Sequence, residues 1–191
     1  QLGLRCGITE LDVTETPTQT RTAEFLAKNP LGQIPVLELD DGRILPESGA
    51  ILFYLAEGTT LLAGDRFDRA QTLSWMFFEQ FSHQPYVAAL HAWTYRNGTE
   101  HLRTDAIERL RVRGQIALES MELHLAARTF FVADRYGIAD IALFAYTQTA
   151  DQIGLRTGSA VKAWLNRVRN TPGYVPIKRE PLPRPPERRW A

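Results

Sequence analysis

One stretch constrains the fold of this chain more than any other. It runs from Asn29 to Ile51 and reads N-P-L-G-Q-I-P-V-L-E-L-D-D-G-R-I-L-P-E-S-G-A-I. Residues Ile34 to Leu39 predict a strand, and Asp41-Gly42 predicts a hairpin turn because glycine adopts a positive φ at low cost. Arg43 to Leu45 is then expected to return as a short antiparallel strand.

The residues before this stretch extend the pattern. Ile8 to Val13 alternate apolar and polar side chains, which predicts a half-buried strand. Gln1 to Arg5 is too short to classify and could be the end of a helix. Thr20 or Thr22 can cap the short helix that follows, and Asn29-Pro30 is expected to end it.

The residues after the hairpin change to a helical pattern. A helix is expected from Ser48, with Gly58 as a left-handed stop. Beyond a linker there are only helical patterns, with a break near Asn97-Gly98. We therefore predict an α/β unit over residues 1–57, an all-helical unit over 65–177, and an extended tail rich in proline and arginine over 178–191.

Composition excludes several classes of function. There are 22 lysines and arginines together and 22 aspartates and glutamates together, so the net charge is zero. The charge balance therefore does not favour binding to nucleic acid or to an anionic membrane. No apolar run reaches the ~18 residues of a membrane span. The single cysteine, Cys6, excludes an intrachain disulfide and fits a cytoplasmic location. No metal is expected, because the four histidines lack metal-ligand spacing: His83, His91, His101 and His124.

Two features of the stretch from Asn29 to Ile51 point to a binding site. Pro35 stands at the start of the predicted strand and removes a ladder donor, so neighbouring backbone groups stay free to bind another chain. Glu47-Ser48 opens the next helix, where free amides favour a bound carboxylate and the glutamate could pair with an amine. The alternative is that Ser48 only caps the helix. The binding interpretation describes a receptor for an extended, peptide-like ligand.

The same stretch, continued to Ala56, resembles the glutathione-binding half of a cytosolic glutathione S-transferase of the bacterial type. Two further segments are similar to parts of that family: W-M-F-F-E-Q-F-S-H-Q-P-Y, Trp75 to Tyr86, and F-F-V-A-D-R-Y-G-I-A-D-I-A-L-F-A-Y, Phe130 to Tyr146. The resemblance covers nearly the whole chain up to about Pro176. It implies a thioredoxin-like α/β domain followed by an all-helical domain.

The resemblance also implies roles for particular residues. The main chain of Ile34, with Pro35 cis, would hold the cysteinyl backbone of glutathione. Glu47 and Ser48 would hold the γ-glutamyl head group, and Gln33 would lie near the glycyl end.

For the electrophile, our candidates are Phe78, His83 and Tyr86, although aromatic residues at this spacing are equally typical of a core. Pro85 should bend this helical run. Asp140 is expected to be structural, at a helix start where the family usually has serine or threonine in place of Gly137.

The function implied is conjugation of the glutathione thiolate to small hydrophobic electrophiles in detoxification, by a homodimer with glutathione as co-substrate. The alternatives are a non-catalytic binding or interaction module and a glutathione-dependent isomerase or reductase. In this family a tyrosine, serine or cysteine after the first strand activates the thiol. Ile8 to Val13 resembles the second strand, so the first strand, most of the first helix and the catalytic residue are expected to lie outside this chain. Cys6 is expected to be a small buried thiol.

Overall fold

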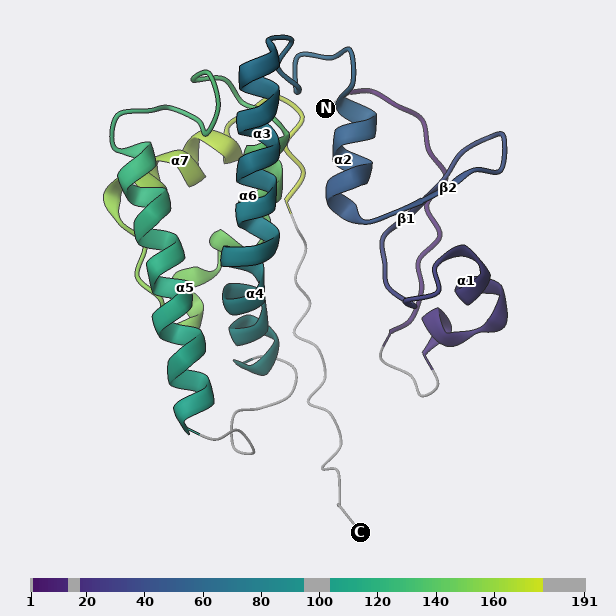
Figure 1. The fold of residues 1–191 in the computed structure, drawn as a ribbon, viewed down its shortest axis with the longest axis horizontal. Helices are drawn as coiled ribbons and strands as arrows, with labels where there is room; N and C mark the ends of the chain where they lie inside the picture. The colour runs from purple at the N-terminus through teal and green to yellow at the C-terminus, as the bar shows by residue number, and fades with distance from the viewer. Residues whose placement is uncertain (1, 14–17, 95–103, 177–191) are drawn as a thin grey trace. The chain divides into compact units, whose positions relative to one another are not determined.

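The computed structural model describes residues 2–13, 18–94 and 104–176, and the chain divides into two compact units, Gln1–Thr59 and Thr60–Ala191 (Figure 1). The first unit has helices and a small sheet, and the second is helical, as the sequence predicts. The predicted break at Asn97-Gly98 and the tail over 178–191 lie outside the described residues.

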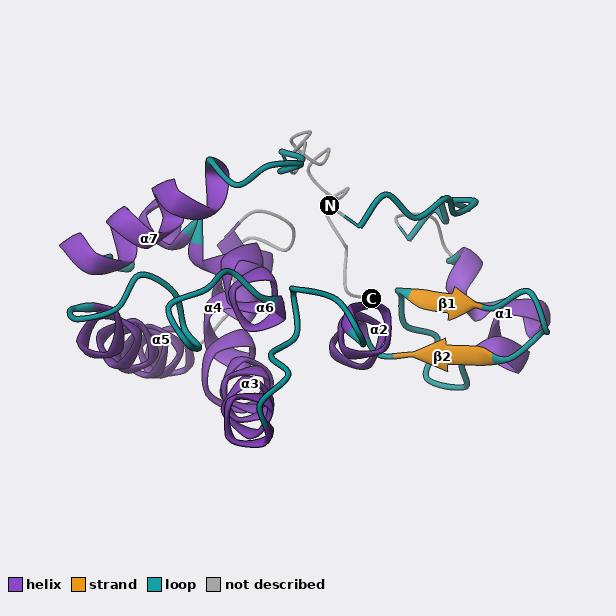
Figure 2. Ribbon diagram, turned by 90° about the horizontal axis from the view of Figure 1, so that it is seen from above, coloured by secondary structure: helices purple, strands orange, loops and turns teal. Residues whose placement is uncertain are grey.

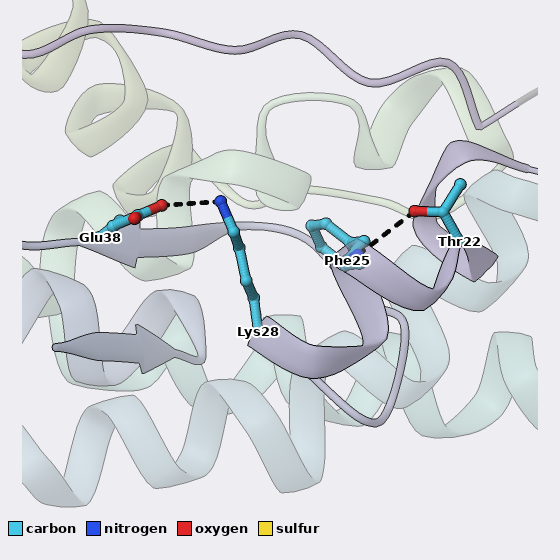
Figure 3. A network of polar contacts seen from close by, with 4 residues as sticks. All are labelled: Thr22, Phe25, Lys28 and Glu38. Carbon is cyan, nitrogen blue, oxygen red and sulfur yellow. Dashed lines mark hydrogen bonds and ion pairs between the residues drawn. The ribbon is translucent and has the colours of Figure 1, made fainter. Parts of the chain in front are cut away.

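The first unit begins its regular structure with a short capped helix. A 3-10 turn, η1 (Gln19–Arg21), leads into α1 (Ala23–Lys28). Thr22 accepts a hydrogen bond from the Phe25 amide at 3.2 Å, which confirms the predicted cap (Figure 3). At the other end of α1, Lys28 Nζ lies 2.8 Å from Glu38 Oε2 and so links the helix to the sheet (Figure 3).

The sheet is the predicted hairpin, with shorter strands. β1 (Val36–Glu38) pairs antiparallel with β2 (Ile44–Pro46), and these are the two strands found among the described residues (Figure 2). The Gly42 amide donates to Leu39 O at 2.8 Å, and Gly42 has a φ of 82°, so this glycine closes the turn as expected.

The predicted strand at Ile8–Val13 is wrong. The segment has no regular structure, and its hydrogen bonds join Asp12 to Gln19 at 2.8 and 3.1 Å, outside any ladder. Ile8 is 82% exposed. Alternation predicts a strand only where a neighbouring strand can accept its backbone hydrogen bonds, and the described residues supply none here. Residues 2–4 are likewise not helical.

The hairpin is followed by α2 (Ser48–Ala56), which ends as the sequence predicts. Glu57 is the residue at its C-terminal boundary, and Gly58 has a φ of 73°. A glycine in this conformation stops a helix without the steric cost that a side chain would bring.

The second unit is a bundle of helices that starts at a capped end. Asp65 accepts hydrogen bonds from the amides of Phe67 and Asp68 at 2.8 and 3.1 Å. The elements in chain order are α3 (Arg66–Phe78), the π-helical segment η2 (Glu79–His83), α4 (Gln84–Ala92), α5 (Thr104–Leu125), α6 (Ile138–Thr147), the 3-10 turn η4 (Ala150–Ile153) and α7 (Ser159–Arg169). Within the described part of the chain, no helix is both long and apolar enough to cross a membrane.

The core of the second unit lies between its long helices. Val87 of α4, Met121 of α5, Leu143 of α6 and Trp164 of α7 are all completely enclosed. Each of these helices directs an apolar face inward, as amphipathic helices in a bundle do.

Asp140 organises the start of α6 from inside this core. Its carboxylate accepts hydrogen bonds from the indole of Trp164 at 2.8 Å, the Gly137 amide at 3.0 Å and the Phe131 amide at 3.2 Å. Gly137 stands where a larger residue would collide, since a Cβ there would lie 2.9 Å from Leu61 O. These contacts give Asp140 the structural position that the sequence predicts.

Candidate functional site

The register of the hairpin brings the two predicted binding motifs to one end. Glu38 pairs with Ile44 next to the turn, and Val36 pairs with Pro46 at the open end of the hairpin. The residues that precede β1, Ile34-Pro35, and those that follow β2, Glu47-Ser48, therefore leave the sheet at the same end (Figure 2). Two segments separated in sequence by the whole hairpin thus form one continuous edge.

The first half of this edge is exposed backbone. The Ile34-Pro35 peptide bond is cis, as the resemblance implies. Gln33 and Pro35 are exposed, and 52% of Ile34 is accessible. Proline has no amide hydrogen, and β1 begins only at Val36, so the Ile34 main chain lies beyond the pairing of the sheet.

The second half is the start of α2, and here the capping alternative for Ser48 is wrong. Ser48 is the first helical residue, and Glu47 occupies the cap position. The Glu47 side chain makes no capping hydrogen bond to the described residues, and both side chains are exposed. The helix dipole and the amides of the first turn favour an anion at such an end.

Glu47 also has an unusual backbone conformation. Its φ of 71° and ψ of 114° lie in a region that residues with a side chain rarely adopt. Such strain costs about 1–3 kcal/mol and is found preferentially at ligand-binding and active sites. The sequence contained no signal for it, because glutamate does not favour this conformation.

Asn29, which the sequence places at a helix end and within the stretch that resembles the family, also organises the loop before this edge. Asn29 is 3% exposed, and its side chain donates to Gln33 O at 2.7 Å and accepts from the Leu31 amide at 3.2 Å. The Asn-Pro pair could have indicated such a turn, since asparagine side chains commonly bond to the backbone two residues ahead.

The electrophile candidates all lie in the second unit. Phe78 packs edge-on against Trp75, with ring centroids 5.1 Å apart, and both contact the core. Tyr86 is half-buried. His83 is completely enclosed, which favours the core interpretation for this residue.

The His83 ring is held by α6. The Thr147 hydroxyl donates to Leu143 O at 2.6 Å and so accepts from His83 Nε2 at 2.9 Å. The other ring nitrogen, Nδ1, is buried without a hydrogen-bond partner among the described residues. Burial lowers the pKa of His83 from 6.5 to about 4, which keeps the imidazole neutral.

Pro85 follows a π-helical segment, and the bend that the sequence predicts there stays a prediction. Proline lacks the amide that would bond to Phe81 O, and its ring collides with that carbonyl, so an α-helical turn cannot continue through it. The chain instead widens over Glu79–His83 before α4 begins. Glu79 is 4% exposed in this segment, and burial raises its pKa to about 7.

The expected burial of Cys6 is wrong. The thiol is free and exposed, because the segment that carries it forms no strand and packs into no core. Among the residues that the structure describes, no group of three or more histidine, cysteine, aspartate or glutamate side chains could hold a metal ion.

Comparison with known proteins identifies the family of this chain. Residues 2–57 match the family model for the glutathione S-transferase N-terminal domain, and residues 75–172 match that for its C-terminal domain. A crystal structure of a possible glutathione S-transferase from Rhodopseudomonas palustris is 46% identical, with a TM-score of 0.76 over 85% of this chain and 77% of that one.

Two other similarities are informative for function. Yeast Ure2p in complex with glutathione is 25% identical, with a TM-score of 0.78 over 90% of this chain and 86% of that one. Elongation factor 1-gamma-B from Xenopus laevis is 34% identical over 124 residues, which are 64% of this chain and 28% of that protein. The chain thus spans under a third of the elongation factor. With both domain models matched, the chain belongs to the glutathione S-transferase family, with a thioredoxin-like first unit and a helical second one.

Proposed function

We propose that this protein binds glutathione at the open end of its hairpin and conjugates the glutathione thiolate to small hydrophobic electrophiles. The observation that carries the proposal is the register of the sheet, which brings Ile34-Pro35 and Glu47-Ser48 to one end. That arrangement offers free main chain for a peptide backbone beside a helix N-terminus for a carboxylate.

Each part of glutathione has a chemically suited counterpart along this edge. The Ile34 main chain would pair with the cysteinyl residue, as an added strand pairs with a sheet edge. The Ser48 amide and hydroxyl would bind the γ-glutamyl carboxylate, and the Glu47 carboxylate would bind its ammonium. Gln33 would lie at the glycyl end. The complex of Ure2p with glutathione supports this choice of ligand.

The second half of the proposal is the reaction itself. Conjugation needs a group that stabilises the thiolate, and we assign that role to no residue described here. Phe78 and Tyr86 remain our candidates for contact with the electrophile. We further propose that the protein is a homodimer with a role in detoxification, on the ground of its family membership. We also propose a cytoplasmic location, which its single free thiol fits.

A non-catalytic role for the same fold is the second candidate. It is favoured by the similarity to elongation factor 1-gamma-B, over a region that is 28% of that protein. In that case the hairpin edge would bind glutathione or a partner without chemistry. A glutathione-dependent isomerase or reductase would use the same binding edge.

Calorimetric titration of glutathione into the full chain tests the binding site. Glu47→Gln and Ser48→Ala should each weaken glutathione by about 1–3 kcal/mol, the scale of a lost charge-assisted hydrogen bond. Asp40→Asn is the control, because it removes the same charge at the turn end of the hairpin and should leave the affinity unchanged. Unchanged affinity in Glu47→Gln would exclude the head-group assignment.

Turnover then separates the candidate functions. A transferase should form a thioether from glutathione and an activated aryl halide. Thioether formation at the rate of the uncatalysed reaction, together with intact glutathione binding, would favour the non-catalytic module. Disulfide reduction in place of thioether formation would indicate the reductase.

A further inference from the structure

The loop before the proposed binding edge is held by one buried side chain. Asn29 makes three hydrogen bonds within the next four residues. Its Nδ2 donates to Gln33 O at 2.7 Å, its Oδ1 accepts from the Leu31 amide at 3.2 Å, and its main-chain O accepts from the Gly32 amide at 2.8 Å. With 3% of its surface exposed, Asn29 has its hydrogen bonding satisfied inside the loop it organises.

The outer side of the same loop is closed by η1. Arg21 Nη1 donates to Leu31 O at 3.2 Å. A Cβ on Gly32 would lie 2.7 Å from that guanidinium nitrogen and 2.9 Å from Thr20 O, so the loop lies directly against the turn. Gly32 also has a φ of 62°, which glycine adopts at a lower steric cost than a residue with a side chain.

We propose that Asn29 is a positioning residue of the glutathione site: its carboxamide sets the path of Leu31 to Gln33 and thereby holds the Ile34 main chain where a peptide ligand can pair with it. The inference rests on the proposed function, because it concerns the same edge. Gln33 O is the last backbone atom that Asn29 holds, and Ile34 is the next residue.

The carboxamide has a chemical requirement that distinguishes it from a generic buried group. It must accept from one backbone amide and donate to one carbonyl in the same turn, and asparagine carries both functions. Asn29→Asp keeps the shape and the acceptor. At neutral pH it loses the donor and directs a negative charge at Gln33 O.

The test is glutathione affinity measured by calorimetry on the full chain at a temperature well below unfolding. Asn29→Asp should weaken glutathione binding about tenfold at pH 7.5. This is the scale expected when a hydrogen bond is lost and a charged group, the new carboxylate, is left facing Gln33 O. The ratio of the variant's Kd to that of the unmodified protein should shrink toward pH 5, because the introduced carboxyl can donate to Gln33 O once protonated.

Thr22→Ala is the matched control. It removes both hydrogen bonds of the Thr22 hydroxyl, from the Phe25 amide and to Gln19 O, neither of which involves residues 29–33. It therefore destabilises the same unit and should leave glutathione affinity within about twofold. Amide hydrogen exchange over residues 30–36 adds a readout that needs no ligand. Exchange there should accelerate in Asn29→Asp and not in Thr22→Ala.

The outcomes distinguish this inference from the proposed function. Unchanged glutathione affinity and unchanged exchange in Asn29→Asp would overturn the inference and leave the proposed site intact. An equal loss of affinity in Thr22→Ala would also overturn it, since destabilisation would then explain the effect. Absence of glutathione binding in the unmodified chain would overturn the proposed function, and the positioning role with it.

Discussion

Single buried polar residues have distinct roles in the second unit. Asp140 receives three donors, and burial still raises its pKa to about 6. Glu79 receives one described donor, Gln80 Nε2 at 2.7 Å, and burial raises its pKa to about 7. In both residues burial raises the pKa, and the hydrogen-bond donors oppose that effect because they stabilise the charged form.

The raised pKa of Glu79 predicts a pH-dependent stability. The folded protein binds this proton more tightly than the unfolded chain, so the free energy of unfolding should fall as pH rises from 4.5 to about 7. Glu79→Gln should remove this fall and gain about 2 kcal/mol relative to the unmodified protein between pH 5 and pH 8.

Urea unfolding across that pH range checks the prediction. His83 contributes an opposite trend, since its lowered pKa costs stability as pH falls through 6.5 toward about 4, and this contribution is common to both proteins. Glu108→Gln, at an exposed glutamate, is the control and should track the unmodified protein. Parallel curves for Glu79→Gln and the unmodified protein would contradict the prediction.

A second residue-scale prediction concerns a strained turn. Val132 and Arg135 pair across Ala133 and Asp134, which both have a φ of 51°. A two-residue turn with a positive φ at both positions favours glycine or asparagine. The Cβ of alanine brings a steric cost in that conformation.

Ala133→Gly should therefore raise the free energy of unfolding by about 0.5 kcal/mol, after the entropy that glycine adds to the unfolded chain. Thermal or urea unfolding measures this gain. Ala127→Gly, at an exposed position outside the left-handed region, should give none. A loss of stability in Ala133→Gly would mean that the alanine side chain contributes packing that outweighs the strain.

At the scale of elements, one side chain joins two helices. Glu122 of α5 accepts hydrogen bonds from the Ala160 and Val161 amides at 2.9 and 2.8 Å, and so caps α7 from outside. Gly158 makes room for it, because a Cβ there would lie 2.2 Å from the Glu122 carboxyl carbon. The carboxylate is also favourably placed at the positive end of the α7 dipole.

Glu122→Ala and Gly158→Ala should each lower the free energy of unfolding by about 1–2 kcal/mol. Their effects should not add, because Gly158→Ala harms the protein mainly by displacing the carboxylate that Glu122→Ala already lacks. A double-mutant cycle in urea unfolding measures the coupling. Additive effects would show that Gly158→Ala acts through its own backbone instead.

The sequence predicted elements well where their signals were local. The hairpin turn at Asp41-Gly42, the Thr22 cap and the stop at Gly58 each depend on neighbouring residues only. The predicted strand at Ile8–Val13 failed because a strand depends on a partner, which alternation does not reveal. The proposed binding edge rests on Pro35, on Glu47-Ser48 and on the resemblance. The conformation of Glu47 and the bonds of Asn29 depend instead on how the loop folds back on itself.

At the scale of the whole molecule, the first expectation is the homodimer. In a two-fold dimer the two subunits bury the same surface patch against each other. Membership of the glutathione S-transferase family is our reason to expect such a dimer here. Sedimentation at micromolar concentration should give about twice the monomer mass of 21.6 kDa. A species at the monomer mass would contradict the prediction.

The two units differ greatly in how much apolar surface they bury internally. Ala56 is the buried apolar side chain found among the described residues of the first unit, whereas the core cluster lies wholly in the second. Burial of apolar surface is the main favourable term in folding, so we expect the described part of the first unit to open more readily than the second unit.

The last prediction follows from this asymmetry. Amides over residues 18–59 should exchange with solvent faster than those of α4 to α6, because local opening costs least where few apolar contacts are lost. Glutathione at 100 times its Kd should slow exchange in the first unit by about a hundredfold, through the roughly 2.7 kcal/mol that binding adds to the folded state. Core amides of the second unit serve as the internal control, and hydrogen exchange with mass spectrometry resolves both sets in one sample. Equal protection of the two units without ligand would show that the first unit draws its stability from contacts beyond its own core.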